Sequence, residues 1–207
     1  LEAKLGCTKA VSFDITAACS GFIFALHVAD KMIKSGANNT VLVIGAEIMT
    51  RVVNWKERES CVLWGDGAGA AVVTASDSGA QVLSTHVHTD GKNGDTLLMP
   101  GGGSKTTPIS YESVDKGLHF LKMIEANRSF KVAVNRFAEA VEEAVEINGK
   151  KVSDVDVIIP HQANLRIIQG MAKRLKVDIG KVYMTIEKYG NISSATVPIA
   201  LDEAVRD

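Results

Sequence analysis

What the sequence lacks excludes several classes of protein. No apolar run comes near the roughly 18 residues that are needed to span a membrane. The first ten residues, LEAKLGCTKA, contain no apolar stretch typical of a secretory signal. Lysine and arginine number 23 against 24 acidic residues, and a formal charge of −1 does not suit a protein that coats a polyanion. We therefore expect no membrane and no nucleic acid among the partners.

Cysteine is also scarce. The three cysteines, at positions 7, 19 and 61, form no CxxC pair, and an odd number cannot all be bridged. Reduced thiols predict a cytoplasmic protein, or a plastid one if the source carries plastids. His86 and His88 alternate along one predicted strand without a third ligand, so we expect surface histidines and no metal site.

The ends of the chain are unusual for a complete protein. With 46% apolar residues, 207 residues suffice for one large domain or two small ones. The chain nevertheless begins with Leu1 rather than methionine and stops at Asp207 inside a predicted helix. We expect it to be part of a larger protein.

Strands and helices alternate along the chain. Helical periodicity predicts helices over 20–35, 127–147 and 163–175, with a last helix from Ser193 onward. Apolar runs predict strands over 11–15, 40–47, 62–64, 68–74, 80–89 and 155–160, of which 40–47 should be covered on both faces. Residues 65–69 (GDGAG) are interpreted as a tight turn, because no helix follows to make a phosphate loop. The alternation predicts an α/β fold with helices over a sheet.

Sites in such folds lie where strands end and helices begin. Cys19, in AACSGF, stands at one of these junctions, at the start of a predicted buried helix. The positive end of the helix dipole favours a thiolate, so we expect a lowered pKa for Cys19. The competing interpretation is a buried structural cysteine.

His161 and Asn191 open two later helices, in PHQAN and YGNISS. Either could be a simple helix cap. Together with Cys19, on three comparable turns, they suit a thiolate nucleophile that faces two hydrogen-bond donors. The sequence therefore predicts an acyl-transfer site.

Four segments in this order resemble the β-ketoacyl-acyl-carrier-protein synthase III family: FDITAACSGF, WGDGAGAAVV, PHQANLRII and YGNISSATVPIALDEAVRD. The resemblance extends over essentially the whole chain. It is specific, because elongating synthases use two histidines and chalcone synthase-like enzymes keep Cys, His and Asn within other motifs. It implies a thiolase-like fold, in which two pseudo-repeated halves form α/β/α/β/α layers, here present in part.

The resemblance also implies a reaction. It is the decarboxylative Claisen condensation of an acyl-CoA primer, expected to be acetyl-CoA, with malonyl-acyl-carrier-protein, which initiates type II fatty-acid synthesis. Cys19 corresponds to the nucleophile that takes the acyl group. His161 and Asn191 correspond to the pair that binds the malonyl thioester carbonyl, where two neutral donors stabilise the enolate. Phe22 corresponds to a residue of the pocket wall, although packing alone also explains it.

Further matches concern coenzyme A and the carrier protein. The resemblance implies a CoA site lined by Arg58, Asn127, Phe130, Ala163, Asn164 and Arg166. It also implies a basic rim for an acidic carrier protein, made of Lys131, Arg166, Lys173 and Arg174, unless these are ordinary solvated cations. No cofactor is implied, since the CoA thioester is a substrate. A homodimer is implied.

The expected division places the remainder of the N-terminal half in 1–89, a long functional or mobile loop in 90–116, and a truncated C-terminal half in 117–207. Relative to the family, the first strand–helix units and a C-terminal glycine-rich loop that completes the oxyanion hole would be absent. We therefore expect these residues alone to be weakly active or inactive. Two alternatives stay open: another thiolase-fold acyltransferase of the polyketide or quinolone type, and a non-catalytic fragment.

Overall fold

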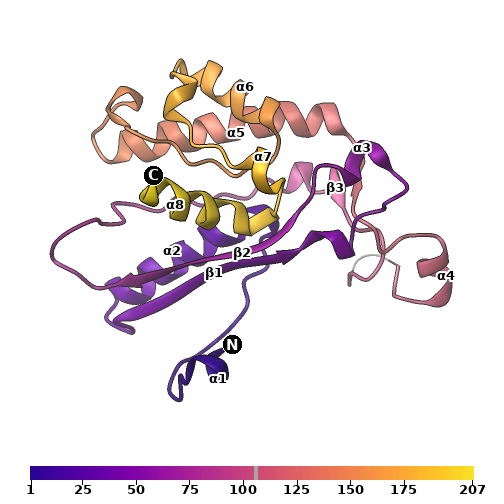
Figure 1. The fold of residues 1–207 in the computed structure, drawn as a ribbon, viewed down its shortest axis with the longest axis horizontal. Helices are drawn as coiled ribbons and strands as arrows, with labels where there is room; N and C mark the ends of the chain where they lie inside the picture. Colours follow the sequence, from indigo (N-terminus) through magenta and orange to yellow (C-terminus); the bar gives the residue numbers. More distant parts are fainter. Residues whose placement is uncertain (105–106) are drawn as a thin grey trace.

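The computed structural model describes residues 1–104 and 107–207 and contains two packed regions, a sheet covered by helices and a pair of helices (Figure 1). In the first, helices α2 (Gly21–Lys34) and α8 (Thr196–Arg206) lie against strands β1 (Thr40–Ile48) and β2 (Asp66–Thr74). In the second, α5 (Ala126–Ile147) packs against α6 (Leu165–Leu175). Short elements occupy the connections: α1 (Glu2–Leu5), η1 (Ala18–Ser20), η2 (Met49–Arg51), α3 (Arg58–Cys61), η3 (Gly91–Asn93), β3 (Leu97–Leu98), α4 (Tyr111–Asp115), β4 (Lys122–Met123), η4 (Val152–Asp154), η5 (Ile179–Lys181), α7 (Ile186–Tyr189) and η6 (Ser193–Ala195).

The β1–β2 sheet is covered on one face only. Its strands are antiparallel, with Thr40 opposite Thr74 and Ile48 opposite Asp66. Val43 on one face is 2% exposed, whereas Leu42 and Val72 on the other are 42% and 65% exposed. The strand predicted over 40–47 is confirmed, but its expected burial on both faces is wrong. The reason is that both covering helices, within the described residues, pack on the same side of a two-stranded sheet.

In the glycine-rich segment GDGAG, residues 66–69 belong to β2 and do not form the turn that the sequence suggested. Because side chains alternate along a strand, Gly67 and Gly69 point to the same face, as does Gly45, the partner of Gly69 across the sheet. A Cβ added to Gly45 would lie 2.8 Å from the carbonyl oxygen of Ser194, and one added to Gly69 would lie 2.9 Å from the backbone nitrogen of Ile199. This glycine face lets the backbone of η6 and α8 lie directly on the sheet.

Helix α2 confirms the prediction over 20–35. Its buried side packs Phe22 and Ala29 against Val43 of β1. The helix ends as expected at Gly36, whose φ of 76° is the left-handed conformation that glycine adopts easily. Cys19 therefore lies two residues before the start of a helix that packs against the sheet.

The α5–α6 pair confirms the predictions over 127–147 and 163–175. Ala138 of α5 packs with the buried face of α6, and the remaining members of this core are Ile158, Ile168, Met171, Ala172, Leu175 and Val182. The two helices approach closely at Gly170, where an added Cβ would lie 2.8 Å from a methyl carbon of Val134. Helix α5 ends at the predicted Asn148-Gly149 pair, with Gly149 at a φ of 65°.

Several predicted strands are wrong. Residues 11–15 and 80–89 form no strand, and 62–64 and 155–160 contribute only single bridges, Trp64 to Asn191 and Ile158 to Val182. An apolar run becomes a strand only beside a partner, and the described part of the chain offers these segments none beyond those bridges. The sequence correctly identified extended, apolar segments but not their pairing.

The segment over 90–116, expected as a long loop, carries short elements of its own. Helix η3 and strand β3 lie within it, and Leu97 of β3 pairs with Met123 of β4. Helix α4 begins with a capping box in which Ser110 and Ser113 bond reciprocally. Residues 105 and 106, also within the expected loop, lie outside the described residues. The loop prediction thus underestimated the local order of this segment.

The glycine face yields a stability prediction. We expect Gly45→Ala to lower the free energy of unfolding by about 1–3 kcal/mol, because the new methyl would displace the Ser194 backbone. Gly91→Ala is the matched control, since nothing lies within 4 Å of its added Cβ, and should change stability by less than about 0.5 kcal/mol. Urea unfolding measures both; equal effects would contradict this account of the packing.

Candidate active site

The turn η6 joins the three predicted catalytic residues. Its residues contact the turn η1, which carries Cys19. Asn191 lies two residues before it, and Thr196, directly after it, is hydrogen-bonded to His161. The structure therefore brings the cysteine, histidine and asparagine segments together around one short turn, which itself lies on the glycine face of the sheet.

Asn191 is buried, with only 5% of its surface exposed, and its amide is oriented. The backbone N–H of Ser193 donates to Asn191 Oδ1 at 2.9 Å. Asn191 Nδ2 donates one long bond of 3.4 Å to the carbonyl oxygen of Ala163. Since the oxygen is held by the turn, the amide group is left as the side of Asn191 that can donate to a ligand.

Ser193 holds this turn in a strained conformation. Its φ of 48° lies in the left-handed region that residues with a side chain rarely adopt. Ala18, directly before Cys19, has a φ of 45°. Such strain costs on the order of 1–3 kcal/mol at each position and clusters at functional sites.

His161 is neutral in this structure. Its Nδ1 lies 2.6 Å from Thr196 Oγ1, and the edge of Phe137 approaches its ring with the centroids 6.4 Å apart. Burial lowers the pKa of His161 from 6.5 to about 4, because the imidazolium would lose its hydration. A neutral imidazole is therefore what a substrate would meet at physiological pH.

Gln162 anchors the loop that carries His161. This side chain is fully buried, yet it satisfies its whole amide group. Its Nε2 donates to the carbonyl oxygens of Pro160 and Tyr183, while its Oε1 accepts from the backbone N–H groups of Thr185 and Ile186. These hydrogen bonds tie the loop to the segment that leads into α7, and they thereby fix the backbone next to His161.

The pKa of the Cys19 thiol is raised, opposite to the direction expected from the sequence. Burial raises it most, and the nearby carboxylate of Glu47 adds to this, while a hydrogen bond with Ser193 lowers it. A helix N-terminus contributes about 0.3–1 kcal/mol, less than one pKa unit, whereas burial can shift a group by several units. The expected lowering of the Cys19 pKa was wrong because the packing around Cys19 removes more water than the sequence could show.

Sequence reasoning missed the polar residues that support the predicted triad. Ser193 and Thr196 surround the catalytic segments, and Glu47 accepts from the Ser194 hydroxyl at 2.6 Å. Glu47 lies within strand β1 and gives no local signal of its role. The run of hydroxyl residues after Asn191 was a usable signal, because three hydroxyls among the buried residues 193–196 require partners.

The residues expected along the CoA path lie on several elements. Arg58 begins α3, and Asn127 and Phe130 lie in the first turns of α5, all of them exposed. The segments leading into these helices are neighbours, since Leu121 N–H donates to the Val52 carbonyl oxygen at 2.8 Å (Figure 1).

The other residues of the expected substrate path divide between the α6 junction and the core. Ala163 is half-buried beside Asn191, and Asn164 caps α6 by accepting from the backbone N–H of Arg166 at 2.9 Å. Phe22 differs, since it is 2% exposed and packed in the α2–β1 core. The packing alternative for Phe22 therefore fits the structure.

The expected basic rim divides into free and paired cations. Lys131, Arg166 and Lys173 are exposed and have no ion pair among the described residues. Arg174 instead bonds to the Asn135 carbonyl oxygen at 2.7 Å and forms ion pairs with Glu139 and Glu142. The geometry gives Arg174 the role of a link between α5 and α6.

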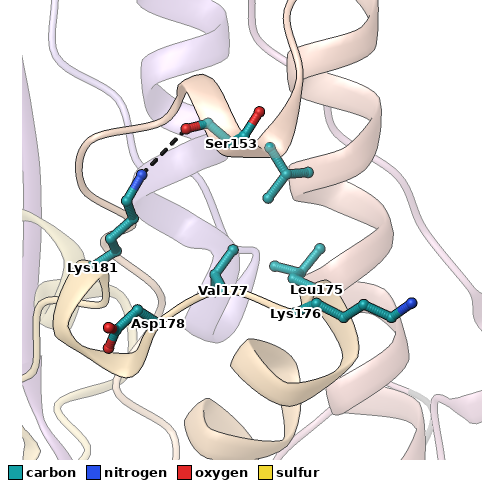
Figure 2. Close-up of a pocket in the computed structure, with 7 residues that line it drawn as sticks. Ser153, Leu175, Lys176, Val177, Asp178 and Lys181 are labelled. Carbon is teal, nitrogen blue, oxygen red and sulfur yellow. Dashed lines mark hydrogen bonds between the residues drawn. The ribbon is translucent and has the colours of Figure 1, made fainter.

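A surface hollow lies apart from these residues, at the C-terminal end of α6 (Figure 2). Lys181 spans it, and its Nζ donates to the carbonyl oxygens of Ser153 and Val155. Because Lys181 is already bonded to the backbone, we interpret the hollow as a structural junction between η4 and η5. Within the described residues no group of three potential metal ligands occurs, and no helix is long and apolar enough to cross a membrane.

The histidines expected at the surface interact with one carboxylate. His88 lies 2.7 Å from Glu143 of α5 and is largely exposed, whereas His86 lies 3.5 Å from it and is mostly buried. The two imidazoles thus dock the segment over 84–88 onto α5. The surface expectation is met by His88 and wrong for His86.

The neutral His161 yields a pH prediction. Its pKa is about 4 in the fold and 6.5 without it, so between these values the unfolded chain binds more protons and stability falls as pH falls. Replacing it in His161→Asn should remove this dependence. We expect the stability of the wild type relative to the variant to fall by on the order of 3 kcal/mol across that window, measured by urea unfolding. Parallel pH profiles would contradict a buried neutral imidazole.

Comparison with known proteins places the chain in a family. Residues 13–91 match the 3-oxoacyl-[acyl-carrier-protein (ACP)] synthase III family, and residues 145–207 match the C-terminal part of that family. A beta-ketoacyl-[acyl-carrier-protein] synthase III from Caldanaerobacter subterraneus subsp. tengcongensis is 48% identical over 206 residues, and another from Xanthomonas campestris pv. campestris is also 48% identical. Each alignment covers 100% of this chain but 62% of the relative, so the chain spans less than two thirds of their length.

Solved structures agree in fold. The crystal structure of 3-oxoacyl-[acyl-carrier-protein] synthase III from Aquifex aeolicus VF5 superimposes with a TM-score of 0.86 at 41% identity, covering 99% of this chain and 61% of that one. The priming beta-ketosynthase of the R1128 polyketide pathway gives 0.83 at 37% identity, covering 99% and 60%. The fold is the thiolase-like one that the sequence predicted, and the chain belongs to the 3-oxoacyl-[acyl-carrier-protein] synthase III family.

Proposed function

We propose that the full-length protein is an initiating condensing enzyme, which joins an acyl-CoA primer to malonyl-acyl-carrier-protein and releases CO₂ and CoA. Membership of the family supports this reaction. The observation that carries it is the arrangement around η6, which gathers a half-buried thiol, a neutral imidazole and an oriented amide. These are a nucleophile and two uncharged donors, the set that such a condensation needs.

In the first half-reaction, the sulfur of Cys19 attacks the thioester carbonyl of acyl-CoA. The bond between that carbonyl and the CoA sulfur breaks, the acyl group stays on Cys19, and the thiol proton ends on the CoA sulfur. Because burial raises the pKa of Cys19, the thiol is mostly protonated in the free site. A half-buried thiol suits this role, since the surrounding protein limits the access of water to the resulting thioester.

In the second half-reaction, His161 and Asn191 donate to the thioester oxygen of the malonyl group. The bond between the carboxylate and the α-carbon breaks, CO₂ leaves, and negative charge appears on that oxygen. The enolate carbon then attacks the acyl carbonyl on Cys19; the new carbon–carbon bond forms as the bond to the Cys19 sulfur breaks, and the departing thiolate takes up a proton from solvent to regenerate the thiol. Donors fixed before the reaction stabilise this charge without reorganising. Support comes from the buried amide of Asn191, whose oxygen is occupied by Ser193, and from the neutral state of His161.

In this proposal the surfaces beside the catalytic residues bind the two substrates. Arg58, Asn127, Phe130, Ala163, Asn164 and Arg166 line the path of coenzyme A. Lys131, Arg166 and Lys173 form the rim that meets an acidic carrier protein, and their freedom from ion pairs among the described residues supports this. The homodimer, the cytoplasmic location, the absence of a cofactor and the division at 1–89, 90–116 and 117–207 stay predictions from the sequence.

A second candidate differs only in the primer. The likeness to the priming ketosynthase of the R1128 polyketide pathway favours it specifically. Acetyl-CoA, branched acyl-CoA and longer acyl-CoA, offered as alternative primers to the full-length protein, distinguish the two. Preference for acetyl-CoA supports fatty-acid initiation, and preference for a longer primer supports the polyketide type.

Radiolabelled acetyl-CoA tests the proposed nucleophile. We expect the label to be bound covalently to Cys19 of the full-length protein and to be lost in Cys19→Ala. Cys7→Ala is the matched control, since Cys7 is an exposed cysteine in the segment just after α1, and it should keep the label. The readout is a mass spectrum of the labelled peptide.

Two outcomes would overturn the proposed function. Equal labelling of wild type and Cys19→Ala would remove Cys19 as the nucleophile. A full-length protein that binds CoA but never releases CO₂ from malonyl-acyl-carrier-protein would support the non-catalytic alternative.

The free cations of the rim give a further prediction. Lys173→Glu in the full-length protein should raise the KM for malonyl-acyl-carrier-protein by about tenfold, because a repulsive charge slows encounter. Acetyl-CoA loading should change little, because Lys173 is not among the residues proposed to line the path of coenzyme A. Lys150→Glu is the control, an exposed lysine beyond the other end of α5. An equal change in KM for both variants would show that only net charge matters.

A further inference from the structure

The side chain of Thr196 connects His161 to η6, and the mechanism above gives it no role. It is buried, with 2% of its surface exposed. Three groups surround its hydroxyl: His161 Nδ1 at 2.6 Å, the Ser193 carbonyl oxygen at 3.0 Å and the Gln162 backbone nitrogen at 3.3 Å. The hydroxyl has a single hydrogen, so it can donate to either His161 or Ser193 but not to both.

The distances favour donation to His161. The 2.6 Å separation from His161 Nδ1 is shorter than the 3.0 Å separation from the other possible acceptor, the Ser193 carbonyl oxygen. It is also below the 2.7–3.2 Å range in which N–H groups donate to oxygen, which disfavours Nδ1 as the donor. The carbonyl of Ser193 does not need the hydroxyl, because the backbone N–H of Thr196 already donates to it. The backbone N–H of Gln162 donates a hydrogen bond to the same hydroxyl oxygen. All three groups are satisfied when the hydroxyl proton points to Nδ1.

This arrangement fixes the tautomer of the ring. A neutral imidazole carries one proton, and burial keeps His161 neutral. If Nδ1 accepts from Thr196, the ring proton must be on Nε2, which has no hydrogen-bond partner among the residues that the structure describes. Nε2 is then a donor that is free to meet a ligand.

We propose that Thr196 is a positioning residue that holds His161 in the Nε2–H form and thereby makes it a hydrogen-bond donor. Its catalytic meaning rests on the proposed function. The opposite tautomer would turn the lone pair of Nε2 toward the enolate oxygen and repel the charge that develops there. A hydroxyl is suited to this role because it can donate to Nδ1, whereas a carboxylate at the same place would accept and enforce the wrong tautomer.

Two variants of the full-length protein test the proposal. Thr196→Val keeps the shape and the backbone N–H but removes the donor, and Thr196→Ser keeps the donor. We expect decarboxylation of malonyl-acyl-carrier-protein to fall by about 10–100-fold in kcat in Thr196→Val, with KM little changed. Labelling of Cys19 by acetyl-CoA should stay within about threefold, and Thr196→Ser should restore decarboxylation to near the wild-type rate. A purely structural role would instead lower both half-reactions together.

Nitrogen-15 NMR of the histidine rings gives an independent reading of the wild type, assigned by loss of the signal in His161→Asn. We expect the one-bond proton coupling on Nε2 of His161, and none on Nδ1. A proton on Nδ1 overturns the proposal, as does full decarboxylation by Thr196→Val. If the wild type labels Cys19 but releases no CO₂, the proposed function fails, while the NMR spectrum still decides the tautomer.

Discussion

The close approach of the η6 and α8 backbone to the β1–β2 sheet is the constraint on which the site depends. It is possible only because Gly45 and Gly69 present no side chain to the backbone above them. With the turn lying directly on the sheet, Ser193 reaches Cys19, and Thr196 reaches His161. Any side chain at the glycine face would lift this turn and separate the nucleophile from the two donors.

Desolvation then sets the chemistry of the gathered groups. Burial raises the pKa of Cys19 and lowers that of His161, so both are uncharged at neutral pH. Polar neighbours compensate locally: Gln162 and Thr196 hold the histidine, and Ser193 holds the asparagine. A site of neutral, oriented groups is matched to a reaction in which negative charge appears on the substrate only during catalysis.

Secondary structure was predicted best from the sequence where the signal for an element is local. The helices α2, α5 and α6 followed from apolar periodicity and from Gly36 and Gly149, and these predictions were confirmed. The strands were predicted poorly, because an apolar run such as 80–89 does not reveal which partner it meets. The same limit applied to GDGAG, where glycine served close packing across a sheet and not the turn that its composition indicated.

The sequence by itself determined the family and the fold class, and it located the cysteine, histidine and asparagine shortly before three helices, because residue type and spacing are properties of the chain. The tertiary structure decided the state of those residues. Desolvation, which depends on everything packed around a group, reversed the expected pKa shift of Cys19. Contacts across long sequence separations, such as that between His161 and Thr196, supplied the supporting hydroxyls that no local pattern could assign.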